Sequence, residues 1–227
     1  MSRIREGSAL AGAGAIAFSV LTAIALTFGG APGGNYRESD VANYVAIGHL
    51  PTVIVTGYLA LFGVLGLICV FAYLREAMSA ESVHKLATSI FWGAGLAAAA
   101  SMAVGWGLVT GIAVAAAEGG SSNPGNAAGA AISHPETYAL SDTSLNVVFG
   151  SGGFMLGFAL IALMVASRGT LPNWLRWLTL VIGVLAIAAP AYFPSFAIPV
   201  WGIVMGVWLI AAGRSSRHVV VATQARA

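Results

Sequence analysis

The feature that most limits the fold of this chain is the length of its uncharged apolar stretches. Residues 41–74 and 86–117 form runs of 34 and 32 residues without Asp, Glu, Lys or Arg. A transmembrane helix needs about 20 mostly apolar residues, so each run can hold one. Only 8% of the 227 residues are charged, whereas soluble domains carry about 25%. We therefore expect a polytopic membrane protein, not a soluble enzyme, a disordered chain or a nucleic-acid-binding protein.

Six segments have the length and apolar character of membrane spans. Gly48 and Pro51 divide the run at 41–74, and proline is favoured in a first helical turn, so the second span should begin near Pro51. Residues 39–47 should form a short helix along the outer interface. We predict an all-α membrane helix bundle with a single domain over residues 1–227. The spans are expected near 8–28, 51–74, 88–112, 145–166, 174–191 and 198–212, with outer loops at 29–50 and 118–144.

The cations predict the orientation of this bundle. With six spans, nine of the ten cations fall on the side of the N-terminus and only Arg37 falls on the other. The positive-inside rule then places both termini in the cytoplasm. A composition rich in Arg, Ala and Gly is typical of a GC-rich bacterial genome. We therefore predict a multi-pass protein of the bacterial cytoplasmic (inner) membrane, with the lipid bilayer as its main partner. The outer side would hold Glu38, Asp40, Glu118, Glu136 and Asp142.

Small and aromatic residues predict how the helices pack and where they end. Glycine pairs four residues apart let helix backbones approach closely in lipid. We expect them to pack within the bundle; the alternative is a seam with a second copy or with another membrane protein. The pairs are Gly107 and Gly111, Gly153 and Gly157, and Gly202 and Gly206. The aromatic belts should include Tyr44 and Trp201 at the outer boundary and Trp174 and Trp177 at the inner one.

The positions of charged residues and histidines exclude several chemistries. Apart from Arg176, assigned to the inner boundary, the six segments hold no Asp, Glu, Lys or Arg, which argues against a proton-coupled transporter or an ion pump. Haem held by two histidines would need a facing pair inside the bundle. His49 lies at an outer span end, His134 lies in a loop, and His84 and His218 are on the inner side. No cofactor is therefore expected.

One cluster of outer residues is a candidate metal site. Histidine and carboxylate side chains bind divalent metals. If loop 118–144 folds back over the start of the second span, His49, His134 and Glu136 would converge on one ion. The alternative is that these residues are solvated and unrelated.

The second half of the chain resembles a family of uncharacterised bacterial six-span integral membrane proteins that is defined only as a domain of unknown function. The resemblance covers roughly residues 145–212. It rests on Gly153-Phe-Met-Leu-Gly157, Ser167-Arg-Gly-Thr-Leu-Pro-Asn-Trp174, Gly183 and Trp201-Gly202. It implies a six-span bundle, but no activity and no catalytic residue.

Three functions remain open from the sequence. Abundant small residues and the scarcity of charge at membrane depth favour a non-enzymatic scaffold or accessory subunit. The first alternative is a transporter or pore for an uncharged or lipophilic solute. The second is a membrane enzyme that uses the His and Glu residues of the outer loops.

Overall fold

The computed structural model describes residues 7–31, 38–46, 48–79, 85–119, 134–188 and 197–224, and within these ranges the chain is helical and contains no strand. The element η3 is a π-helical turn that joins α5 to α6. The elements are α1 (Ser8–Phe28), α2 (Glu38–Tyr44), α3 (Leu50–Ser79), α4 (Lys85–Gly119), α5 (His134–Leu145), η3 (Asn146–Ser151), α6 (Gly152–Ala166), α7 (Asn173–Ile187) and α8 (Ala197–Gln224).

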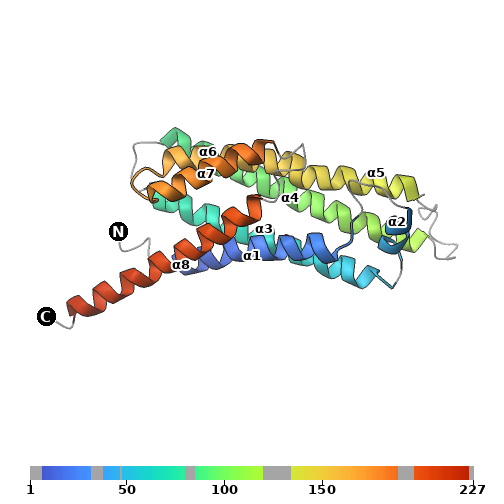
Figure 1. Cartoon of the computed structure of the whole chain (residues 1–227), viewed down its shortest axis with the longest axis horizontal. Helices are drawn as coiled ribbons and strands as arrows, with labels where there is room; N and C mark the ends of the chain where they lie inside the picture. The colour runs from blue at the N-terminus through green and yellow to red at the C-terminus, as the bar shows by residue number, and fades with distance from the viewer. Residues whose placement is uncertain are drawn as a thin grey trace.

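The long helices pack in the order in which they occur in the chain. Helix α1 packs on α3, α3 on α4, α4 on α6, α6 on α7 and α7 on α8, and α8 returns to α1. The contact between α7 and α8 is the least extensive of these. Helix α1 begins and α8 ends at the same end of the bundle, and the last turns of α8 extend beyond it (Figure 1). The core contains large, fully buried side chains, among them Phe18, Leu67, Phe71, Phe91, Leu156, Leu160, Leu163, Trp201 and Met205.

Four of these helical segments are long and apolar enough to cross a membrane. They are Ser8–Phe28, Leu50–Met78, Lys85–Ala117 and Pro135–Ala166; the last includes η3 and α6. Two shorter apolar helices cover Asn173–Ile187 and Ala197–Gly213. The all-helical class and the membrane character therefore agree with the sequence analysis. Whether all six segments cross a bilayer stays a prediction.

The structure confirms the short helix before the second long one and corrects one loop. Helix α2 covers Glu38–Tyr44, so it begins one residue before and ends three residues before the predicted 39–47. The stretch predicted as an outer loop at 118–144 is partly helical, because α4 continues to Gly119 and α5 begins at His134. Pro135 and Glu136 favour a helix start, since the first turn needs no N–H from proline and attracts negative charge.

Three close backbone crossings hold neighbouring helices together. A Cβ added to Gly12 of α1 would stand 2.6 Å from the carbonyl oxygen of Gly206 in α8. A Cβ on Gly14 would stand 2.7 Å from the carbonyl oxygen of Gly66 in α3, and a Cβ on Gly157 of α6 would stand 2.6 Å from that of Gly183 in α7. These spacings leave no room for a side chain, so glycine is required at each crossing.

The pair Gly107 and Gly111 does not follow the prediction of packing within the bundle. Both lie on the exposed side of α4, and no described atom stands within 4 Å of a Cβ added to either. Gly93, about four turns before Gly107 on the same helix, is equally open. The reason is the rotation of α4, which directs Gly105 and not Gly107 toward Val148 and the Ser144 carbonyl.

Candidate functional site

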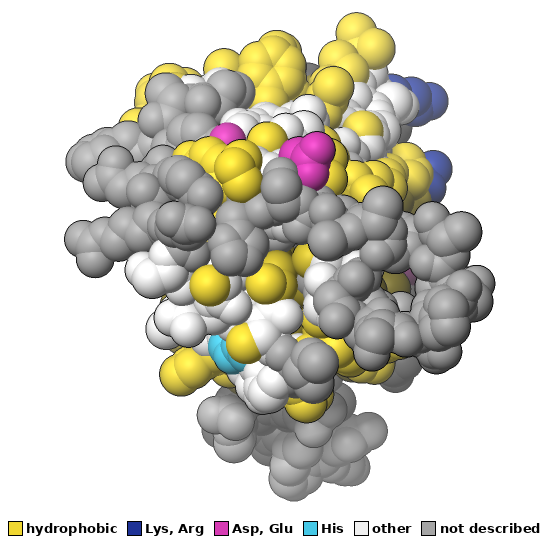
Figure 2. All heavy atoms as spheres, turned by 90° about the vertical axis from the view of Figure 1, so that its right-hand side faces the viewer, with side chains coloured by type: hydrophobic (Ala, Val, Ile, Leu, Met, Phe, Trp, Pro, Cys, Tyr) yellow, Lys and Arg dark blue, Asp and Glu magenta, His cyan; other side chains and the backbone are white. Residues whose placement is uncertain are grey.

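The two ends of the bundle carry opposite charge. We call the end where α1 begins the basic end, because its described side chains include Arg75, Lys85, Arg168 and Arg176 against one acid, Glu76. We call the other the acidic end, because Asp40 on α2 and Glu136 and Asp142 on α5 lie there. Figure 2 looks onto the acidic end, where acidic side chains and a histidine side chain lie on separate parts of the face.

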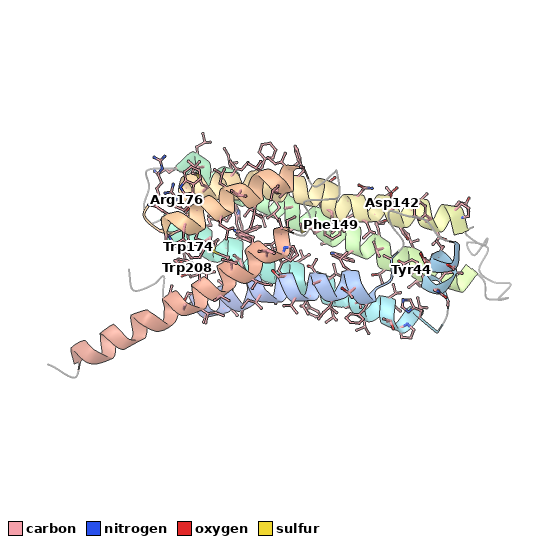
Figure 3. The ribbon with its side chains drawn as sticks, in the orientation of Figure 1. Tyr44, Asp142, Phe149, Trp174, Arg176 and Trp208 are labelled. Atoms are coloured by element: carbon pink, nitrogen blue, oxygen red, sulfur yellow. The ribbon has the colours of Figure 1, made fainter. Side chains whose placement is uncertain are left out.

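At the basic end, two arginines are held by contacts within the protein. The Arg176 Nε donates to the Met164 carbonyl oxygen at 3.2 Å, and its Nη1 donates to the Asn173 Oδ1 at 3.1 Å. The Met164 carbonyl is one of the last four of α6, which have no partner inside their own helix. Arg75 stacks on Trp92, with its Cζ 4.8 Å from the ring centroid. Figure 3 shows Arg176, Trp174 and Trp208 gathered at this end.

At the acidic end, Tyr44 fastens α2 to the bundle. Its side chain is fully buried, and its hydroxyl donates to the Val109 carbonyl oxygen of α4 at 2.6 Å. Figure 3 places Tyr44 between α2 and the last turns of α4. Burial raises the pKa of the Tyr44 phenol above its ordinary value, and a hydrogen bond with the Ser141 hydroxyl of α5 lowers it by a smaller amount. Tyr44 therefore stays protonated and serves as a neutral hydrogen-bonding group.

The buried face of α5 is lined by hydroxyls. Thr137, Ser141 and Ser144 are all almost completely buried, and their spacing of four and three residues places them on one side of the helix. The Ser144 Oγ donates to the Leu140 carbonyl at 2.7 Å. The Thr137 hydroxyl has no hydrogen-bond partner among the residues that the structure describes, whereas the Ser141 hydroxyl lies against the Tyr44 phenol.

His49 and Glu136, two residues of the predicted metal site, lie at the acidic end in different settings. His49 is half-buried at the start of α3, where its carbonyl accepts from the N–H groups of Thr52 and Val53. Its imidazole packs against Gly30, which follows α1 and has a φ of +63°. Glu136 is exposed in the first turn of α5.

No group of three or more His, Cys, Asp or Glu that could hold a metal ion occurs within the described ranges. The side chain of His134 lies outside what the structure describes, although its backbone begins α5. Convergence of His49, His134 and Glu136 on one ion therefore stays a prediction.

Two aromatic residues expected in the outer belt are instead buried. Tyr44 bonds to α4 as described above. Trp201 of α8 is fully buried, and its Nε1 donates to the Thr179 Oγ1 of α7 at 3.1 Å, across the least extensive helix contact. Trp174 and Trp177 are more than half exposed, as a lipid-facing belt requires. Each of the two buried side chains donates to an oxygen on another helix, the Val109 carbonyl or the Thr179 hydroxyl. The sequence alone does not show which helices are neighbours, so it could not predict these bonds.

Comparison of the chain with known protein families, with characterised proteins and with solved structures finds no match. The resemblance of residues 145–212 to a six-span family therefore stays a prediction.

Proposed function

We propose that this chain is a six-span protein of a bacterial cytoplasmic membrane, with both termini in the cytoplasm. Its support is the agreement between the fold and the charges: α1 begins and α8 ends at the basic end. Basic residues are retained on the cytoplasmic side of bacterial membranes. The packing of Gly157 against Gly183 fits membership of the six-span family, since both residues carry that resemblance.

Reporter fusions test this topology. Fusions after Ala80, Ser167 and Ser215 should report cytoplasm, and fusions after Gly120 and Ser195 should report the outside. Each position lies between two predicted spans or after the last one, so the signal should alternate along the chain. Signals opposite to the expected ones at any two of these positions would refute the six-span layout.

We further propose that the protein is a non-enzymatic scaffold or accessory subunit that contacts a membrane partner through α4. The observation that carries this proposal is the outward face of that helix. Small residues recur along it and are exposed: Gly93, Ala97, Ala100, Gly107, Gly111 and Ala115. In lipid, where no hydrophobic force drives helices together, small residues permit the close approach on which association depends.

The scarcity of charge in the spans supports a passive role. Within the apolar segments predicted as spans, the one charged residue is Arg176. Its side chain donates hydrogen bonds to the Met164 carbonyl and to Asn173, so it caps the C-terminal end of α6. Transporters coupled to protons or ions usually keep ionisable groups at membrane depth.

Site-specific photo-crosslinking tests the α4 face. Leu108 is 47% exposed beside Gly107, and Val181 on α7 is a matched control at 54%. A photoreactive phenylalanine analogue at Leu108, in native membranes, should give a discrete protein adduct, and the same group at Val181 should give none. An adduct of twice the chain mass would identify a homo-oligomer, and another defined mass would identify an accessory subunit. Equal labelling at both positions, or none at Leu108, would refute the proposal.

A further inference from the structure

We propose that the corner between α6 and α7, at the basic end of the bundle, binds the headgroup phosphate of an anionic phospholipid through Arg168 and Arg176. The loop that joins the two helices lies at this end (Figure 1). The site goes beyond the proposed function and rests on it in one respect, that the basic end lies at a membrane surface.

The part of the chain that forms this corner carries an unbalanced positive charge. Residues 143–227 contain five arginines and no Asp or Glu. The one acid that the structure describes at the basic end is Glu76 of α3, whereas α7 packs on α6 and α8. The chain from α6 to α8 therefore supplies no carboxylate to Arg168 or Arg176.

Arg176 is held in place by neutral acceptors. It is half-buried, and its Nε and Nη1 donate to the Met164 carbonyl and to the Asn173 side chain at 3.2 and 3.1 Å. Both acceptors are uncharged, so these bonds orient the guanidinium and leave its positive charge uncompensated. A guanidinium has five N–H groups, and 5 − 2 = 3 of them have no bond to the residues that the structure describes. Donors and charge are therefore left for an anion.

Arg168 adds a second charge on the same side of α6. The Ser167 N–H still bonds to the Leu163 carbonyl at 2.9 Å, so the chain keeps its helical path past the end of α6. Arg168 is exposed and follows Met164 by four residues, or about one turn. Met164 is also the residue whose carbonyl holds Arg176. Two arginines at one corner suit a phosphate, because the planar guanidinium can donate two parallel hydrogen bonds to its oxygens.

The neighbouring apolar surface favours a lipid over a soluble phosphate. Trp174 and Trp177, which precede and follow Arg176 on α7, are both more than half exposed. Tryptophan at the end of a membrane helix lies at the level of the lipid headgroups. Val181 and Leu185 continue the exposed side of α7 away from this level. Acyl chains can therefore lie along α7 while the phosphate meets the arginines, and basic sites between helices are known to bind anionic headgroups in this way.

Native mass spectrometry of the purified full-length chain tests the site. Delipidated protein in a non-ionic detergent is titrated with phosphatidylglycerol and, in parallel, with phosphatidylcholine of the same acyl chains. Phosphatidylglycerol should bind more tightly, because the choline cation compensates the phosphate of the other lipid. Arg168→Gln should weaken phosphatidylglycerol binding by about fivefold, and Arg168→Gln combined with Arg176→Gln by about 25-fold.

Arg75→Gln is the matched control. It removes the same charge at the basic end, but Arg75 belongs to α3 and stacks on Trp92 of α4, so the Kd should stay nearly unchanged. Equal weakening by Arg75→Gln and Arg168→Gln would mean a diffuse attraction to the whole basic end and would overturn the site. Equal binding of the two lipids by the unaltered protein would overturn it without any variant.

A soluble competitor distinguishes a lipid from a free phosphate ester. Glycerophosphoglycerol carries the same headgroup without acyl chains, so at equal concentration it should not displace phosphatidylglycerol. Displacement would overturn the assignment to a lipid. The titration is made in detergent and does not depend on the side of the membrane, so its failure and a failure of the six-span topology in the reporter fusions are separate results.

Discussion

The crossing of α6 and α7 at Gly157 allows a quantitative prediction. In Gly157→Ala, the new methyl carbon would stand 2.6 Å from the Gly183 carbonyl oxygen, 2.7 Å from the Ile187 Cγ1 and 2.8 Å from the Ile187 nitrogen. Ordinary contacts of a Cβ begin near 3.4 Å. The two backbones must therefore separate by the difference, 3.4 − 2.6 = 0.8 Å, at this point.

A separation of this size is costly for a close-packed pair. A gap of 0.5 to 1 Å forfeits roughly a quarter to a half of the dispersion energy of the atoms involved. Overpacking by a methyl group typically costs about 1–3 kcal/mol, and the higher helix propensity of alanine returns up to about 1 kcal/mol. We expect a net loss of about 1–2 kcal/mol and a fall in Tm of roughly 2–8 °C.

The matched control is Gly93→Ala, which adds the same methyl group where no described atom lies within 4 Å. It should leave Tm unchanged or raise it slightly. Thermal unfolding of both purified variants in one detergent, followed by circular dichroism or by light scattering, measures the difference. Equal shifts for Gly157→Ala and Gly93→Ala would refute the argument that the α6–α7 crossing depends on glycine.

Three further predictions concern one titration and two single hydrogen bonds. Burial raises the pKa of Tyr44, so above about pH 10 the unfolded chain loses a proton that the folded protein retains. The stabilisation should therefore be full below that pH and fall above it. Unfolding measured as a function of pH should show a smaller fall for Tyr44→Phe. Trp201→Phe should lower stability by about 1 kcal/mol, because it leaves the buried Thr179 hydroxyl unpaired, and adding Thr179→Val should recover part of the loss in the same melting assay. Arg176→Gln should loosen the end of α6 by removing the donor to the Met164 carbonyl, and hydrogen exchange should increase in the last turn of α6 more than elsewhere.

Much of the fold follows from hydropathy, because a long apolar run is removed from water whichever helices surround it. Helical structure covers five of the six predicted segments in full, α7 ends at Ile187 within the predicted 174–191, and the short helix α2 was also predicted. Helix α5 was not, since its buried face carries Thr137 and Ser141 in place of apolar residues. Hydropathy reads such a segment as a loop.

The packing partners could not be predicted. The pairing of Gly14 with Gly66 joins two helices whose glycines follow no common spacing. The pair Gly107 and Gly111 has the expected spacing but faces outward. Spacing shows which residues share a helix face, whereas the direction of that face depends on the whole bundle. The same limit applies to Tyr44 and Trp201, whose partners lie on other helices, 65 and 22 residues away in the sequence.

The unequal helix lengths have a consequence for the surrounding bilayer. Helix α4, with 35 residues, is about 52 Å long, whereas α7, with 15 residues, is about 22 Å long. The hydrocarbon core of a bilayer is about 30 Å thick, so in the proposed six-span layout lipids beside α7 would meet a short apolar surface and those beside α4 a long one. Such mismatch is accommodated by local thinning or by tilt, at a fraction of a kcal/mol per Å. The protein should therefore deform the bilayer asymmetrically and partition toward thinner membranes, with the α7 side determining the preference.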